Sequence, residues 1–319
     1  MAEIYTSVPD ALVPLLQSHL PRSLPVLRRL QFTRFKGGMR PTARVIFASD
    51  PHSRLAPEQD GPAAEPRNFT AAYLDFGSVR ETNLFIYSTL EDGNVSSDEE
   101  KETCELLIMA ALDAVKKVGK EQPDGRADPG GCLVGTLATV TREVMIRRGA
   151  HVKPRATYEY EKWLFRVDEI PEVDVALPEG AVWSPANETD CEIVISRTYV
   201  PRAVKTLMSF PSLVIRLEDG TPIAWAFLGT DGSLSSLHCE EPYRKRGYAK
   251  ALAAKLFKRS TGDYGSDGWG SADVAPDNVG SRGMCKSLKG KHVWNCSWNI
   301  VQLEPLEEPV GPNPPGSNE

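Results

Sequence analysis

The clearest hydrophobic pattern lies at residues 233–257. A strand-like run at 233–239 passes through a charged turn into a segment whose apolar residues recur at helical spacing, with lysines on the opposite face. The apolar positions of this segment are Ala249, Leu252, Ala253, Leu256 and Phe257. The pattern predicts a strand, a tight turn and a helix that packs on a sheet.

Segments on either side of this unit extend the same sheet. Residues 217–227 are typical of a β-hairpin, with Asp-Gly at its turn. Residues 270–274 predict a further strand. The Trp-containing run at 293–300 predicts the last strand, and its tryptophans either pack in the core or line an acyl tunnel.

The first half also mixes helices and strands. We expect helices at residues 10–20, 24–30, 97–118 and 132–148, strands at 44–48, 69–76 and 82–88, and then a strand at 163–166 and a helix at 199–208. The chain is therefore predicted to be an α/β protein with a mixed sheet in two domains, at 1–165 and 177–303. Residues 166–176 form the expected linker. The Pro- and Glu-rich residues 304–319 are expected to be a disordered tail.

The turn before the helix has the chemistry of an anion site. Arg244, Lys245 and Arg246 are followed by Gly247, where the helix begins. A helix N-terminus presents unpaired N–H groups and a partial positive charge, and a glycine lets the backbone approach a ligand closely. This stretch is suited to a pyrophosphate.

Arg244, Gly247 and Ala249 resemble the Arg/Gln-x-x-Gly-x-Gly/Ala loop of the GCN5-related N-acetyltransferases (GNAT), which holds the pyrophosphate of acyl-CoA. The preceding hairpin and the later Asn278 follow the order of that superfamily. Within that superfamily, the chain is similar to the glycine N-acyltransferase-like proteins with an FR47-like C-terminal domain. The first half lacks such a loop, and the resemblance implies a degenerate second copy of the fold.

The resemblance implies a set of ligand contacts. The residues expected to bind acyl-CoA are Leu237, Cys239, Arg244, Lys245, Arg246, Gly247, Tyr248, Ala249, Asn278 and Ser281. Backbone N–H groups near Leu237 to Cys239 would face the thioester oxygen, where negative charge develops. Asn278 and Ser281 would contact the pantetheine arm or cap a helix.

The catalytic base is less well defined by the sequence. The position of the subgroup's proposed glutamate is Pro242, so Glu241 and His238 are the candidates. The competing interpretations are a solvated turn for Glu241 and a strand residue without chemistry for His238. Cys285 occupies the place where many members have a tyrosine, and a small buried residue is the simplest interpretation.

Composition narrows the class of protein. The net charge is −6 and the pI about 5.6, which argues against non-specific nucleic-acid binding. No apolar run is long enough for a membrane span, and no signal-peptide pattern is present, so we expect a cytoplasmic protein, with a mitochondrial location left open. The six cysteines are scattered, which predicts reduced thiols and no metal site.

These observations predict an N-acyltransferase that uses acetyl-CoA or another acyl-CoA. The acceptor would be a small-molecule amine or an amino acid. The first domain would either shape the acceptor pocket or serve only as a scaffold. The alternatives are a CoA-binding or interaction protein that has lost the chemistry, and a protein acetyltransferase. The sequence does not define the oligomeric state.

Overall fold

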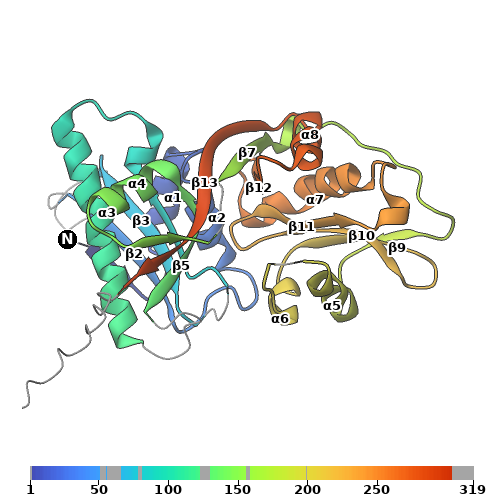
Figure 1. Cartoon of the computed structure of the whole chain (residues 1–319), viewed down its shortest axis with the longest axis horizontal. Coiled ribbons are helices and arrows are strands. Elements are labelled where there is room, and N and C mark those ends of the chain that lie inside the picture. Colours follow the sequence, from blue (N-terminus) through green and yellow to red (C-terminus); the bar gives the residue numbers. More distant parts are fainter. Residues whose placement is uncertain are drawn as a thin grey trace, which may run out of the picture.

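A computed structural model describes residues 2–50, 55, 66–77, 81–122, 130–155, 159–198 and 200–303. Two α/β halves lie side by side and share one sheet (Figure 1). Within the described residues, the strands follow the order β1-β2-β3-β4-β5-β13-β7-β12-β11-β10-β9-β8, and β6 pairs with β13. The strands are β1 (Ala2–Tyr5), β2 (Ala43–Ser49), β3 (Phe69–Asp75), β4 (Leu84–Ser88), β5 (Gly131–Ala138), β6 (Val152–Pro154), β7 (Tyr160–Arg166), β8 (Val182–Ser184), β9 (Ser212–Arg216), β10 (Pro222–Leu228), β11 (Ser233–Cys239), β12 (Trp269–Val274) and β13 (Lys291–Gln302).

Helices cover both faces of the sheet. The α-helices are α1 (Leu12–Ser18), α2 (Leu24–Phe32), α3 (Asp98–Glu121), α4 (Thr139–Arg147), α5 (Glu188–Ser196), α6 (Val204–Leu207), α7 (Tyr248–Tyr264) and α8 (Val279–Ser287). In the first half, alternate residues of β2 and β3 face opposite layers, as the pleat of a strand requires. Val45 and Tyr73 pack with α1 and α2, whereas Ile46 and Leu74 pack with α3 and α4. In the second half, α7 packs on β10 and β11.

The two halves exchange strands at their junction. β7 belongs to the first half in sequence, yet it pairs with β12 and with the first part of β13. The second part of β13 crosses to the first half and pairs with β5 and β6. Figure 1 shows β13, in red, running from one half into the other. Each half is therefore completed by the other, and the domain boundaries predicted from the sequence stay a prediction.

Most of the expected elements are present, and two expectations were wrong. Residues 132–148 form strand β5 followed by the short helix α4, because a central strand buried on both faces is apolar throughout and resembles a buried helix. Of the helix expected at 199–208, only Val204–Leu207 is helical among the described residues. The expected tail lies outside the described residues.

Helix α5 was missed although it carries a local signal. Asn187 accepts a hydrogen bond from the Asp190 N–H at 2.9 Å, and the Asp190 carboxylate accepts one from the Asn187 N–H at 2.8 Å. This reciprocal capping box is visible in the sequence Asn-Glu-Thr-Asp.

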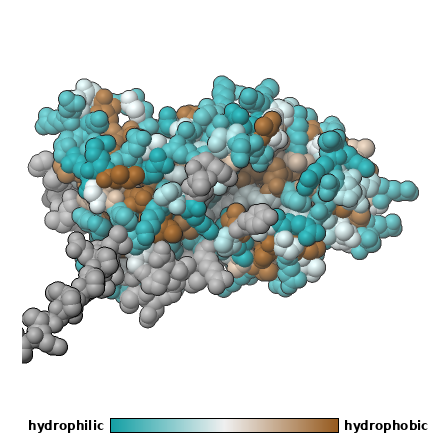
Figure 2. Space-filling view, viewed as in Figure 1, coloured by the Kyte–Doolittle hydropathy of each residue, from teal (hydrophilic) through white to brown (hydrophobic). Residues whose placement is uncertain are grey.

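The surface carries apolar side chains in separate patches with hydrophilic side chains between them on the face seen in Figure 2. Among the described helices, none combines the length and the apolar character that crossing a bilayer requires.

Candidate active site

The basic turn before α7 adopts the geometry of an anion loop. Lys245 has φ +62° and Gly247 φ +85°, and Gly247 occupies the N-cap position of α7 without any side-chain cap. Arg244, Lys245 and Arg246 are exposed around it. The first N–H groups of a helix have no partner within the helix. With no capping side chain, those of α7 are available to a phosphate.

The strands in front of this loop separate. β11 runs parallel to β12 and pairs with it at Ser233 and Leu234, and no pair with β12 follows in the rest of this described strand. Ser236 has φ +51° and lies at a register shift against β10. The result is a wedge-shaped opening that begins beside Ser235.

One backbone donor of β11, the Cys239 N–H group, points into this opening. The Glu240 N–H donates to the Ile223 carbonyl oxygen on β10 at 2.9 Å. Successive N–H groups of an extended strand alternate in direction. The Cys239 N–H group is therefore directed toward β12, whereas Leu237 lies within the register shift against β10, where this alternation does not apply.

Asn278 acts as the helix cap that the sequence allowed. Its side-chain oxygen accepts a hydrogen bond from the Ser281 N–H at 3.0 Å at the start of α8. Cys285, on the same helix, is fully buried, and burial raises the pKa of its thiol to about 12. A thiol in this state is a packing residue, as expected.

A cavity of about 500 Å³ lies between the two halves. It reaches the point where β11 and β12 separate, because Ser235, Ser236 and Asp273 all line it. The first half contributes Arg29, Glu81, Thr82, Phe85, Arg155 and Tyr160 to its wall. Trp298 of β13 also lines it and contacts Tyr160 edge to face.

Charged groups of both signs face this cavity. The Arg202 Nε is buried without a hydrogen-bond partner among the described residues, and burial lowers the pKa of Arg202. Arg29 lies over the Tyr73 ring, with 3.6 Å between its guanidinium carbon and the ring centre. Asp231 is buried and accepts a hydrogen bond from the Ser233 hydroxyl at 2.7 Å, while Glu81 accepts one from the Thr206 hydroxyl.

Asp273 lies at the strand separation, because it directly follows Ala272, the last residue of β12 paired with β11. Its Oδ1 lies 2.6 Å from the buried Nζ of Lys162 and accepts a hydrogen bond from the Cys296 thiol at 3.4 Å. Asp273 was not among the site residues predicted from the sequence. A lone aspartate within an apolar strand is a signal for a buried functional or paired charge.

The two predicted base candidates lie elsewhere. His238 stacks on Trp225 with 4.6 Å between ring centres, and its Nε2 is 3.6 Å from Glu240 Oε2. Glu241 is exposed in the 3-10 turn that follows β11. Neither residue lines the cavity between the halves.

The corresponding region of the first half is built differently. β4 and β5 are also parallel and pair at Leu84 and Val134. Helix α3 begins with Asp98, Glu99 and Glu100, and Ser97 caps it by accepting a hydrogen bond from the Glu100 N–H at 3.1 Å. Acidic residues at a capped helix N-terminus repel a pyrophosphate.

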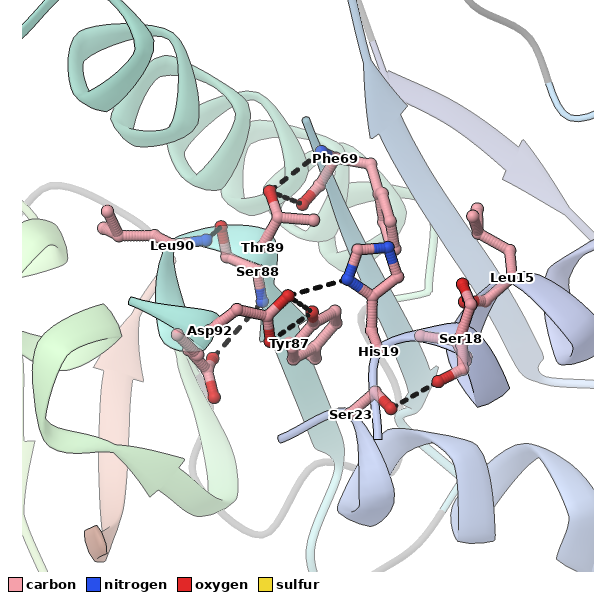
Figure 3. Close-up of polar contacts among 12 residues, drawn as sticks. Leu15, Ser18, His19, Ser23, Phe69, Tyr87, Ser88, Thr89, Leu90 and Asp92 are labelled. Atoms are coloured by element: carbon pink, nitrogen blue, oxygen red, sulfur yellow. Dashed lines mark hydrogen bonds and ion pairs between the residues drawn. The ribbon is translucent and has the colours of Figure 1, made fainter. Parts of the chain in front are cut away.

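Side chains occupy the end of β4 in this half (Figure 3). The Tyr87 hydroxyl donates to Asp92, with 2.9 Å to each carboxylate oxygen, and His19 Nδ1 lies 2.7 Å from Asp92 Oδ2. Glu91 beside them is buried, accepts a hydrogen bond from the Thr141 hydroxyl at 2.7 Å, and has its pKa raised to about 8, chiefly by burial. This half therefore offers no comparable anion loop in the residues that the structure describes.

Residues 2–163 match the family described as the acyl-CoA N-acyltransferase verG N-terminal domain. The chain belongs to this family. Membership of this family supports acyl transfer as the general chemistry and an acyl-CoA as the donor. Among curated proteins, no sequence matches the chain.

Solved structures share the fold of this chain. A Drosophila protein has a TM-score of 0.60 at 15% identity, over 94% of this chain and 98% of its own. A GCN5-related N-acetyltransferase from Sphaerobacter thermophilus has a TM-score of 0.52 at 14% identity, over 95% and 96%. A tandem GNAT protein from the clavulanic acid biosynthesis pathway has a TM-score of 0.52 at 10% identity, over 96% of this chain and 100% of its own. These likenesses confirm the tandem GNAT fold predicted from the sequence.

No group of three or more His, Cys, Asp or Glu residues placed to hold a metal ion is found in the described part of the chain.

Proposed function

We infer that this protein transfers an acyl group from acyl-CoA to the amine of a small molecule or amino acid. The main observation in support is that the opening between β11 and β12 is continuous with the cavity between the halves. The opening between β11 and β12 ends at an uncapped helix N-terminus on one side and reaches the charged cavity at Ser235 on the other. A donor in the opening and an acceptor in the cavity would meet where the strands separate.

The residues expected to hold acyl-CoA have the appropriate chemistry. The N–H groups at the start of α7 and the cations Arg244, Lys245 and Arg246 would hold the pyrophosphate. The Leu237 and Cys239 N–H groups would hold the thioester oxygen and stabilise negative charge on it during attack. Asn278 and Ser281 stand at the start of α8, near the expected path of the pantetheine arm.

The cavity favours a small acceptor. About 500 Å³ lies in the range of small-molecule sites, and a flexible peptide would require an open groove. Arg202 and Arg29 suit a carboxylate, while Asp231 and Glu81 suit an ammonium group. The pattern supports an amino acid, in keeping with the resemblance to glycine N-acyltransferase-like proteins.

The first half would shape this acceptor site. Arg29, Glu81 and Arg155 reach the cavity from α2 and from the loops around β4 and β6. This placement favours a part in substrate binding over a scaffold alone.

Two measurements test the proposal. Calorimetry with acetyl-CoA, benzoyl-CoA and free CoA would establish donor binding, and thiol release with a panel of amines and amino acids would establish transfer. Binding followed by acceptor-dependent thiol release is expected. Binding without release for any acceptor would favour the alternative, a CoA-binding protein that has lost the chemistry.

A further inference from the structure

We propose that Asp273 accepts the proton of the attacking amine, which assigns a catalytic residue to the function proposed above and rests on it. Asp273 lies on β12, one residue beyond the last pair with β11, and lines the cavity together with Ser235 and Ser236. Neighbouring strands are about 4.8 Å apart where they pair. Its carboxylate therefore stands close to the place where thioester and amine would meet.

The two oxygens of Asp273 have different surroundings. Oδ1 contacts the Lys162 ammonium at 2.6 Å and the Cys296 thiol at 3.4 Å. Oδ2 is buried and has no hydrogen-bond partner among the described residues. A buried carboxylate oxygen without a partner is costly. The Asp273 side chain keeps 7% exposure and lines the cavity, so an ammonium group bound there would meet this carboxylate. Lys162, with 0% side-chain exposure, fixes the carboxylate in this position.

The charged and titratable groups that face Asp273 come from three elements. Lys162 belongs to β7, Cys296 to β13, and Asp231 to the turn between β10 and β11. Burial raises the pKa of the Asp273 carboxyl, Asp231 adds to the rise, and the Lys162 ammonium opposes it. A raised pKa brings a carboxylate closer to the basicity that deprotonation of an ammonium group needs.

The step balances without any further reactant. The ammonium group of the acceptor gives one proton to the Asp273 carboxylate, and its freed electron pair forms the C–N bond to the thioester carbonyl carbon. The C–S bond then breaks and the CoA thiolate leaves with the electron pair. The thiolate receives the second proton of the attacking nitrogen, and Asp273 returns its own proton to solvent. The products are the amide and free CoA.

The test compares protonated and unprotonated acceptors. Thiol release from acetyl-CoA is measured for Asp273→Asn with glycine, glutamine and ethylamine, which are protonated at neutral pH, and with hydroxylamine, which is not. We expect kcat to fall by about 100-fold or more for the protonated amines and by only a few-fold for hydroxylamine. The deficit with protonated amines should shrink as the pH rises, while the KM for acetyl-CoA stays the same.

Further variants separate catalysis from folding. Because Asp273→Asn leaves the Lys162 charge buried and unpaired, the double variant Lys162→Gln/Asp273→Asn provides a neutral pair at the same position. Asp273→Glu should restore part of the rate. Asp190→Asn is the matched control. Asp190 lies on α5, outside the cavity, and its buried carboxylate pairs with Arg216. Asp190→Asn should lower the stability of the protein, and any loss of kcat should be the same for hydroxylamine and for the protonated amines.

The outcomes are distinct. An equal loss for hydroxylamine and the protonated amines, in both the single and the double variant, would overturn the assignment of Asp273 alone. Wild-type protein that binds acetyl-CoA but turns over none of these acceptors would overturn the proposed function, and the assignment with it.

Discussion

Lys162 and Asp273 face each other on adjacent strands, with 2.6 Å between Nζ and Oδ1, and both side chains are buried. Lys162 belongs to β7 of the first half, and Asp273 to β12 of the second. The pair lies within the exchanged strands that join the halves. It also stands beside the cavity in which we place the acceptor.

Exchange of strands should make the two halves unfold together. A fragment of residues 1–165 lacks the partner that β13 provides for β5, and a fragment of residues 166–303 lacks most of β7 between β12 and β13. Open sheet edges expose unpaired backbone groups. We expect a single calorimetric unfolding transition for the full chain and no cooperative transition for either fragment. Two separate transitions, or a stably folded fragment, would contradict this interpretation.

Gly247→Asp should abolish tight binding of acetyl-CoA. The substitution places a carboxylate at the anion loop, in a backbone conformation that disfavours side chains. We expect calorimetry to show at least about tenfold weaker binding, equivalent to about 1.4 kcal/mol. Gly220→Asp is the matched control, because Gly220 is also exposed with φ +90°, in the β9–β10 turn. Equal affinities for the two variants would place the pyrophosphate elsewhere.

Each chain should bind one acyl-CoA. The second half has an uncapped helix N-terminus next to a basic turn, whereas the first half has a capped and acidic one. Titration of acetyl-CoA should therefore saturate at one equivalent per chain. A stoichiometry of two, persisting in Gly247→Asp, would show that the first half also binds the donor.

Glu91 should make stability depend on pH. Burial raises the pKa of Glu91 from 4.5 to about 8. Between pH 4.5 and 8, the folded protein therefore keeps a proton on Glu91 that the unfolded chain has already released. The contribution of Glu91 to the free energy of unfolding is therefore fully present below pH 4.5 and is lost as the pH rises toward 8, by up to a few kcal/mol. Glu91→Gln should flatten this part of the profile in urea unfolding. Glu99→Gln, at the exposed start of α3, should leave it unchanged.

Glu241→Gln and His238→Gln test the base candidates predicted from the sequence. Neither side chain lines the cavity, so we expect each variant to keep kcat within a few-fold of the wild type. A loss of about 100-fold with unchanged affinity for acetyl-CoA would return the role of base to that residue.

Local signals in the sequence were sufficient to predict the basic turn, the helix that follows it and the preceding hairpin, and they gave helix capping as one of two roles for Asn278. These features depend on local chemistry. A glycine at positive φ, a run of cations and an apolar stripe at helical spacing act within a few residues of one another, so their pattern is visible in the chain. The same signals supported the tandem GNAT fold.

The strand exchange, the cavity and the place of Asp273 are apparent only in the folded structure. β7 and β13 pair with strands distant in sequence, and their own residues do not specify which partner they take. Residues 132–148 illustrate the same limit, since an apolar run becomes a strand or a helix according to what surrounds it. The cavity brings Arg29, Glu81, Arg202 and Asp273 together from separate elements. Such proximity arises from packing between elements, which no local pattern in the sequence encodes.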